Sequence, residues 1–171
     1  GASGELGRLK LKALQEVQRA FGQSAFFAFK DPRTCRTLPF WQDVLARHGA
    51  TTFNIIAFRN PMSVAESLQA RNGFTRERSY HLWLLHMLAA VKHTQGRPRV
   101  FIEYDDLIAD PEATLTRIAK MINDPRVTIG AHALQTYQRD FLDSGLRRHF
   151  NQSSHLDLDE ACSPFVREVY E

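Results

Sequence analysis

A short polar segment that could bind phosphate directly follows an apolar run. The run covers Phe53 to Phe58 and predicts a buried strand, and Asn60 and Pro61 come two and three residues after its end. Asn60 suits the N-cap of a helix and Pro61 suits its first position. A helix should therefore begin where the strand ends, with its free N–H groups and the positive end of its dipole at the sheet edge.

Three side chains around this helix start could bind an anion. Arg59 precedes the cap and carries a guanidinium fork that matches phosphate oxygens. Ser63 and Ser67 are four residues apart and so share one helical face. The alternative is a capped helix with surface serines and an ion pair between Arg59 and Glu66. The residues alone do not decide between the two interpretations.

A second charged segment follows another apolar run. Phe26 to Phe29 predicts a buried strand, and Lys30, Asp31 and Arg33 come immediately after it, with Pro32 in the turn. The residues alone favour a solvated turn with a local ion pair. The alternative is a functional site, because charged groups at a strand exit can bind a ligand or take part in catalysis.

No metal centre is expected. The acids in the segment Glu103 to Asp106 could bind Mg²⁺, but such clusters more often cap a turn or pair with arginines. His86 and His93 share a helix face without a third ligand. The only cysteines, Cys35 and Cys162, have no metal spacing and form no disulfide framework.

Composition bounds the class of protein. The 171 residues are 43% hydrophobic and 24% charged, which is enough for one globular domain over residues 1–171. Apolar runs are too short for a membrane span, and there is no signal-peptide pattern. The net charge of +3 suits an anionic ligand, but the basic residues form no dense stripe, so nucleic acid is not the expected partner. We expect a cytoplasmic protein.

Strands and helices are expected to alternate along the chain. The most regular pattern lies in the segment Glu77 to Thr94, where apolar residues recur at helical spacing. Glycines just past several segments mark helix ends. The expected strands are Phe26–Phe29, Phe53–Phe58 and Val100–Tyr104. The expected helices are Glu5–Phe21, Leu38–His48, Pro61–Asn72, Glu77–Thr94, one beginning at Pro111, Ala131–Leu142 and Asp159–Tyr170, the last broken near Pro164, with a loop over Ser144–Ser154.

This alternation predicts an α/β fold. Strands joined by helices pair in parallel through right-handed crossovers, which gives a three-layer parallel sheet flanked by helices. Ligands bind such sheets at the carboxyl ends of the strands. The polar segments named above stand at those ends.

The order and spacing of these segments resemble sulfotransferases that use 3′-phosphoadenosine 5′-phosphosulfate (PAPS). The resemblance is strongest over residues 25–150, and its motifs are specific as an ordered set rather than singly. The resemblance implies that Arg59 and Ser67 hold the 3′-phosphate of the nucleotide, and that 3′-phosphoadenosine 5′-phosphate (PAP) is the product. The motifs that carry it are Lys30-Asp31-Pro32-Arg33, Leu38-Pro39-Phe40-Trp41, Arg59-Asn60-Pro61 with Ser67, Trp83, Tyr104-Asp105-Asp106-Leu107, Asp110-Pro111 and Leu146-Arg147-Arg148-His149.

One departure from the family concerns its opening strand and Gly/Ser/Thr-rich loop, which grip the 5′-phosphosulfate. Nothing in the sequence matches them, so the resemblance implies an N-terminally incomplete P-loop-like sulfotransferase fold. The sheet would then have an open edge, which a homodimer partner or a missing segment could cover.

The resemblance does not assign the catalytic base, because family members use a histidine or a glutamate and neither position maps onto this sequence. From its place at a strand exit, Asp31 is a candidate base for the acceptor's proton, and Lys30 could steady the sulfate. Arg147 and Arg148 could close over the nucleotide, although an exposed basic loop is an equal alternative. The acceptor, a small molecule or a glycan with a hydroxyl or amine, is not specified by the sequence.

Two rival functions remain. A degenerate sulfotransferase-like module could bind the nucleotide or a protein partner without catalysis. A P-loop phosphotransferase would share the parallel sheet but requires a Gly-x-x-x-x-Gly-Lys-Ser/Thr loop, which the sequence lacks.

Overall fold

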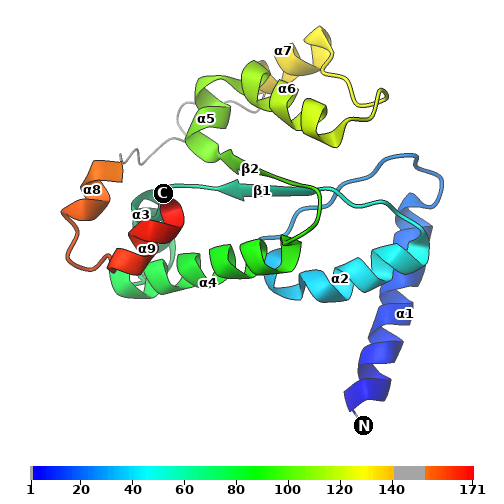
Figure 1. The fold of residues 1–171 in the computed structure, drawn as a ribbon, viewed down its shortest axis with the longest axis horizontal. Helices are drawn as coiled ribbons and strands as arrows, with labels where there is room; N and C mark the ends of the chain where they lie inside the picture. Colours follow the sequence, from blue (N-terminus) through cyan, green and yellow to red (C-terminus); the bar gives the residue numbers. More distant parts are fainter. Residues whose placement is uncertain (1, 141–152) are drawn as a thin grey trace.

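Two parallel strands form the sheet of the described chain. The computed structural model describes residues 2–140 and 153–171, and in this part β1 (Asn54–Phe58) pairs with β2 (Arg99–Glu103) from Asn54 opposite Arg99 to Phe58 opposite Glu103 (Figure 1). The chain passes from β1 to β2 through α3 (Pro61–Asn72) and α4 (Arg76–Thr94). Helices make up most of the described residues, so the arrangement is α/β with a small parallel sheet.

The ends of the helices beside the sheet follow from their capping residues. Asn60 caps α3 ahead of Pro61, and Gly73 ends it in the left-handed conformation with φ of 66°. The same pattern opens α6 (Pro111–Ile122), where the Asp110 carboxylate accepts the N–H of Ala113. These predicted boundaries are confirmed, as are both strands to within a residue.

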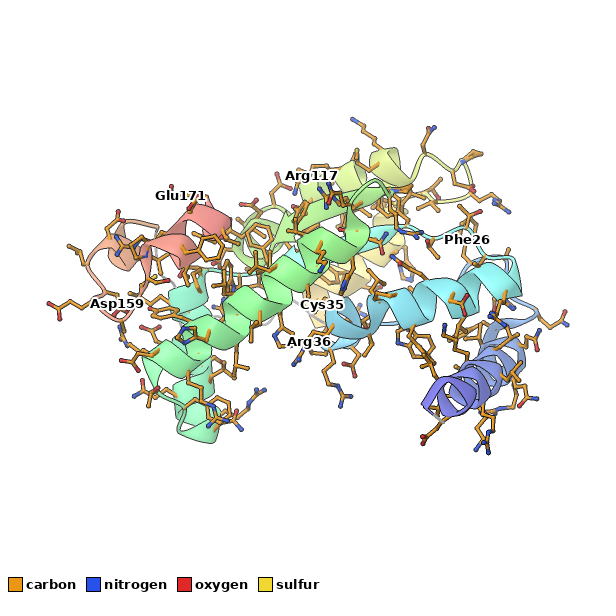
Figure 2. All side chains as sticks on the ribbon, turned by 60° about the horizontal axis from the view of Figure 1, so that its bottom comes forward. Phe26, Cys35, Arg36, Arg117, Asp159 and Glu171 are labelled. Carbon is orange, nitrogen blue, oxygen red and sulfur yellow. The ribbon has the colours of Figure 1, made fainter. Side chains whose placement is uncertain are left out.

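Helix α4 is the centre of packing. It contacts α3, α2 (Thr34–His48), β1 and α9 (Pro164–Tyr170). One apolar core lies around its N-terminal half, and it combines α3 and α4 with the last segment of the chain. Figure 2 shows Asp159 near the start of α4 and Cys35 nearer its other end. The core residues are Met62, Ala65, Tyr80, Trp83, Leu156, Cys162 and Val166.

A second core joins α1 (Ala2–Phe21) to α2 through Val17, Val44 and Leu45. Helix α2 begins at Thr34, four residues before the predicted start, which leaves Pro39 inside the helix. A proline at this position cannot bond the carbonyl four residues earlier, that of Cys35. In the structure this carbonyl accepts a hydrogen bond from Nδ1 of His93 instead, at 2.9 Å. Helix α4 thus supplies the partner that Pro39 removes.

The predicted strand Phe26–Phe29 is wrong. This segment forms no strand in the structure, and its rings pack against different elements. Phe27 stacks on Phe21 at 4.5 Å between centroids, and Phe29 lies 5.2 Å from Trp41. Because the rings are held by α1 and α2, the segment bridges two helices rather than adding to the sheet.

The second half of the chain differs from expectation in its short helices. Tyr104, predicted as the end of a strand, begins α5 (Tyr104–Ala109), and α7 covers Ala131–Asp140. The predicted loop 144–154 lies largely outside the described residues, and its last two positions start α8 (Ser153–Asp157). The helix predicted over Asp159–Tyr170 with a break near Pro164 is present only after that break, as α9, which Ser163 caps. No helix among residues 2–140 and 153–171 has the length and apolar character needed to cross a bilayer.

Candidate anion-binding site at the start of α3

The junction between β1 and α3 is fixed by a buried asparagine. Asn60 is fully buried, and its Oδ1 accepts the N–H of Met62 at 2.9 Å and that of Ser63 at 3.4 Å. The next residue, Pro61, has no N–H to satisfy. The first turn of α3 is therefore capped from within the protein, at the carboxyl end of β1.

Arg59 lies across the carboxyl ends of both strands. Its carbonyl accepts the indole N–H of Trp83 from α4 at 2.9 Å, which fixes the backbone. Its guanidinium lies over the ring of Tyr104, the residue that follows β2, at 4.7 Å from the centroid. This cation–π contact holds the arginine at the mouth of the two-stranded sheet.

The two serines of α3 differ in accessibility. Ser67 is exposed, whereas Ser63 is fully buried. The two serines lie four residues apart in α3, as predicted, but only the hydroxyl of Ser67 is open to solvent. Ser67 comes six residues after Pro61, about 9 Å along the helix, so an anion touching both Arg59 and Ser67 would lie beside the first turns of α3.

The C-terminal helix also reaches the strand ends. The hydroxyl of Tyr170 in α9 donates to the carboxylate of Glu103, the last residue of β2. Its ring lies 6.2 Å from both Phe58, the last residue of β1, and Trp83. Sequence reasoning missed Tyr170, because no local signal indicates that this residue, 111 positions after Arg59, returns to the same place.

A buried polar group anchors the segment that leads to α9. The side chain of Asp159 is 7% exposed and accepts hydrogen bonds from the Tyr80 hydroxyl at 2.5 Å and from Arg76 at 2.7 Å. Burial by itself raises the pKa of Asp159, but the hydrogen bonds from Tyr80, the Ala161 N–H and Arg76 outweigh it and leave the pKa below its ordinary value. Burial, and then the bond to the Asp159 carboxylate, raises the pKa of Tyr80.

The candidate catalytic pair lies in a different turn. Arg33 donates to Asp31 through two side-chain nitrogens, at 2.9 and 2.7 Å, and through its backbone N–H at 2.8 Å. These bonds lower the pKa of Asp31 well below its usual range, side-chain bond first. A carboxylate with a lowered pKa accepts a proton less readily, which weakens the case for Asp31 as a base. Lys30 beside it is exposed.

This turn and the start of α3 attach to different parts of α4. The turn runs into α2, whose Cys35 is bonded to His93, whereas Arg59 is bonded to Trp83, ten residues earlier. Ten residues span about 15 Å of helix. These two hydrogen bonds therefore place the predicted catalytic turn and the predicted phosphate site at separate positions along α4.

Arg147 and Arg148 lie outside the described residues. Over residues 2–140 and 153–171, no group of three or more His, Cys, Asp or Glu side chains is arranged to hold a metal ion. Two of the acids considered as Mg²⁺ ligands, Asp105 and Asp106, stand in the first turn of α5, where the helix dipole favours negative charge.

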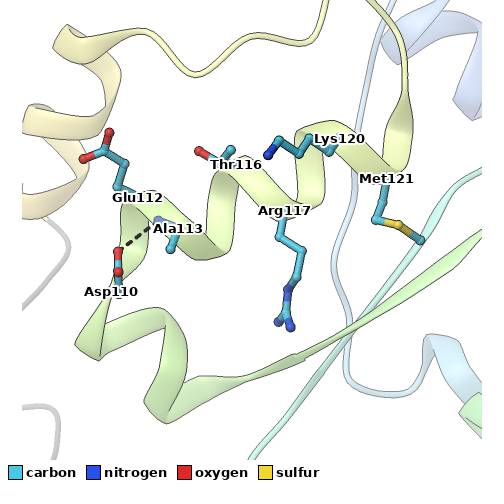
Figure 3. A pocket seen from close by; sticks show the side chains of 7 residues that line it. All are labelled: Asp110, Glu112, Ala113, Thr116, Arg117, Lys120 and Met121. Atoms are coloured by element: carbon cyan, nitrogen blue, oxygen red, sulfur yellow. Dashed lines mark hydrogen bonds between the residues drawn. The ribbon is translucent and has the colours of Figure 1, made fainter.

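The surface also has a hollow along α6, away from any residue predicted to bind a ligand. All its lining residues belong to Asp110 or to α6, so it is a furrow on one helix (Figure 3). Its two acids, Asp110 and Glu112, lie at the start of the helix and its two bases, Arg117 and Lys120, lie farther along, so the hollow has no single charge that would select a ligand. We therefore keep the candidate site at the start of α3. The lining residues are Asp110, Glu112, Ala113, Thr116, Arg117, Lys120 and Met121.

The comparisons with known proteins add no relative. No family model, no curated protein and no solved structure matches the chain.

Proposed function

We propose that this chain binds the 3′-phosphorylated nucleotide of a PAPS-dependent sulfotransferase, in a three-layer P-loop-like fold. The observation that carries the proposal is the junction at Asn60. A buried cap starts α3 at the carboxyl end of a parallel strand, with Arg59 held beside it over Tyr104. Helix starts at strand ends are where α/β proteins bind phosphate.

Two features of the site fit the 3′-phosphate. The guanidinium of Arg59 can donate two parallel hydrogen bonds to phosphate oxygens, and the exposed hydroxyl of Ser67 can donate a third. The first turn of α3 adds a favourable dipole. The nucleotide supplies the sulfuryl group of the reaction. In that transfer the bond from sulfur to the phosphate oxygen breaks, a bond to the acceptor oxygen or nitrogen forms, and the acceptor's proton passes to a base.

A nucleotide-binding module without catalysis is the second candidate. It is favoured by the tight pairing of Asp31 with Arg33, which disfavours proton transfer to the one candidate base. The acceptor, the cytoplasmic location and a role for Lys30 stay predictions from the sequence.

Calorimetric titration with PAP tests the binding proposal, with adenosine 5′-phosphate as the comparison ligand. We expect Arg59→Ala to weaken PAP binding by about 10- to 100-fold, because it removes charge-assisted hydrogen bonds. Ser67→Ala should have a smaller effect of the same sign. Neither variant should change the weaker binding of adenosine 5′-phosphate.

Arg71→Ala is the matched control, because Arg71 is an exposed arginine of α3 whose side chain donates a hydrogen bond to its neighbour Asn72. It should leave PAP affinity unchanged. Equal affinity for the two nucleotides, or equal losses in Arg59→Ala and Arg71→Ala, would remove the proposal.

A further inference from the structure

The edge of β1 that faces away from β2 is open in the described part of the chain. The N–H of Asn54 donates to the carbonyl of Pro98 at 3.0 Å, so the backbone groups of Asn54 point toward β2. Backbone groups alternate in direction along a strand. The N–H and C=O groups of Ile55 and Ala57 therefore point to the other side. Among residues 2–140 and 153–171, no backbone hydrogen bond outside the ladder with β2 involves either residue.

The side chains beside this edge are exposed on one face of the sheet. Ile55 is 52% exposed and Ala57 is also exposed, whereas Ile56 between them is 8% exposed. Ile55 and Ala57 project from the same face of the strand. A strand added at the open edge would therefore set its own side chains beside an apolar side chain that is now half in water.

The outer edge of β2 is different. There the carbonyl of Phe101 accepts a hydrogen bond from the guanidinium of Arg117 at 3.2 Å. Figure 3 shows Arg117 extending from α6 toward this strand. A side chain from α6 thus meets this edge, and the open edge of the described sheet belongs to β1.

The sequence of β1 lacks the features that keep edge strands apart. Asn54–Phe58 contains no charged residue and no proline, either of which discourages pairing with a second chain. A strand of this kind is a template for another uncharged strand.

We propose that β1 pairs with β1 of a second copy of this chain, antiparallel and centred on Ile56. The outward-facing residues lie symmetrically on either side of Ile56, so a two-fold axis sets Ile55 opposite Ala57 of the partner subunit, and the reverse. In an antiparallel ladder such opposed residues exchange both of their N–H···O bonds. The pairing uses every outward backbone group of Ile55 and Ala57 and gives a four-stranded sheet.

The side chains and charges also suit a second copy. Each Ile55 would lie beside the smaller Ala57 of the partner subunit, so that apolar surface is buried without crowding. Arg59 would lie opposite Phe53 of the partner subunit, so no like charges face each other across the pair. The residues that leave the edge open are thus compatible, in size and in charge, with a second copy of the same strand.

A cross-linking experiment tests the register. The variants Ile55→Cys and Ala57→Cys are mixed and oxidised, and the disulfide-linked dimer is quantified. Opposed hydrogen-bonded residues have Cα atoms about 5.5 Å apart, within the range of a disulfide. Each variant alone places its new thiols two positions apart, beyond the reach of about 7 Å. We expect the mixture to give several times more linked dimer than either variant alone.

The unsubstituted protein gives the background from Cys35 and Cys162. A mixture that links no more than the single variants would overturn the proposed pairing, as would linkage that is equal in all samples.

Sedimentation velocity across a concentration series gives an independent readout. We expect a dimer whose dissociation constant rises by roughly tenfold or more in Ile55→Lys, because a charged side chain at an open edge opposes pairing. Met121→Lys is the control, since Met121 is an equally exposed apolar residue on α6. Far-UV circular dichroism confirms that each variant is folded. A monomer at every concentration, or equal weakening by both lysines, would refute pairing between copies.

Discussion

The anchor at Asp159 should dominate the stability of the C-terminal segment. Asp159→Ala removes the acceptor of the Tyr80 hydroxyl, and Tyr80 is 2% exposed, so the hydroxyl is left buried without its partner. An unsatisfied buried hydroxyl costs about 1–3 kcal/mol. The bond to Arg76 adds less, because that side chain is 40% exposed and its charge is screened by solvent. Together these losses predict a decrease of about 3 kcal/mol in the free energy of unfolding.

Equilibrium denaturation in urea measures this decrease, with far-UV circular dichroism as the probe. Tyr80→Phe keeps Asp159 paired with Arg76 and should lose only about 1 kcal/mol. Asp157→Ala is the matched control, because the side chain of Asp157 is 62% exposed and pairs with Arg167 at 3.4 Å. That exposed pair should contribute about 0.5 kcal/mol or less. Equal losses in Asp159→Ala and Asp157→Ala would refute the reasoning.

The same anchor has a defined pH dependence. The folded pKa of Asp159 lies below its ordinary value, so the carboxylate stabilises the fold above the unfolded pKa of about 3.9. This contribution is lost as the pH falls from there through the folded pKa. The difference in stability between the unsubstituted protein and Asp159→Ala should therefore be constant near neutral pH and shrink below about pH 4. A difference that persists undiminished through acid pH would mean that charge does not contribute to the anchor.

Two further changes test the site at the start of α3. Asn60→Ala removes the cap from the N–H groups of Met62 and Ser63 and should lower the free energy of unfolding, measured in urea, by about 1–2 kcal/mol. Asn60→Ser should recover part of this loss. No loss in Asn60→Ala would mean that the cap is dispensable. Tyr170→Phe removes the hydrogen bond to Glu103 but keeps the ring against Trp83. Titration with PAP should show binding weakened by a few-fold, with little change in stability. Unchanged binding would mean that α9 does not contribute to the site.

Local chemistry explains which parts of the fold could be predicted from the sequence. The starts of α3 and α6 follow from an N-cap residue and a proline side by side, and Gly49 and Gly73 end their helices with positive φ. Each of these signals acts within a few residues and does not depend on the rest of the chain. The two observed strands likewise follow from continuous apolar runs.

Contacts between distant residues explain the errors. Pro39 argued for a helix beginning near it, but the bond from His93 to Cys35 allows α2 to begin earlier. The aromatic run Phe26–Phe29 looks like a strand, yet its rings are held by α1 and α2. Periodicity cannot separate a buried strand from an apolar segment that bridges helices, because both require only that the side chains be apolar.

Only part of the candidate site could be predicted, because the rest depends on contacts between distant residues. Arg59 and the cap at Asn60 belong to one local motif, and the structure retains that motif at the end of β1. The contributions of Trp83, Tyr104 and Tyr170 depend on where α4, α5 and α9 pack. Burial of Ser63 likewise depends on packing, and helical spacing alone could not distinguish it from the exposed Ser67.

The open edge and the candidate site belong to the same strand, and this has a mechanistic consequence. Arg59 is the residue after β1. A strand that pairs along the whole free edge therefore comes within one strand spacing, about 4.8 Å, of the backbone of Arg59. In the antiparallel dimer, Phe53 of the partner subunit would lie beside the backbone of Arg59, on the side away from Tyr104, and exclude water from this end of β1. Charge-assisted hydrogen bonds strengthen when water is excluded, so pairing of the strands and binding of a phosphate would favour each other. By linkage, the dimer would bind the nucleotide more tightly than the monomer, and each bound nucleotide would tighten the dimer by that same factor.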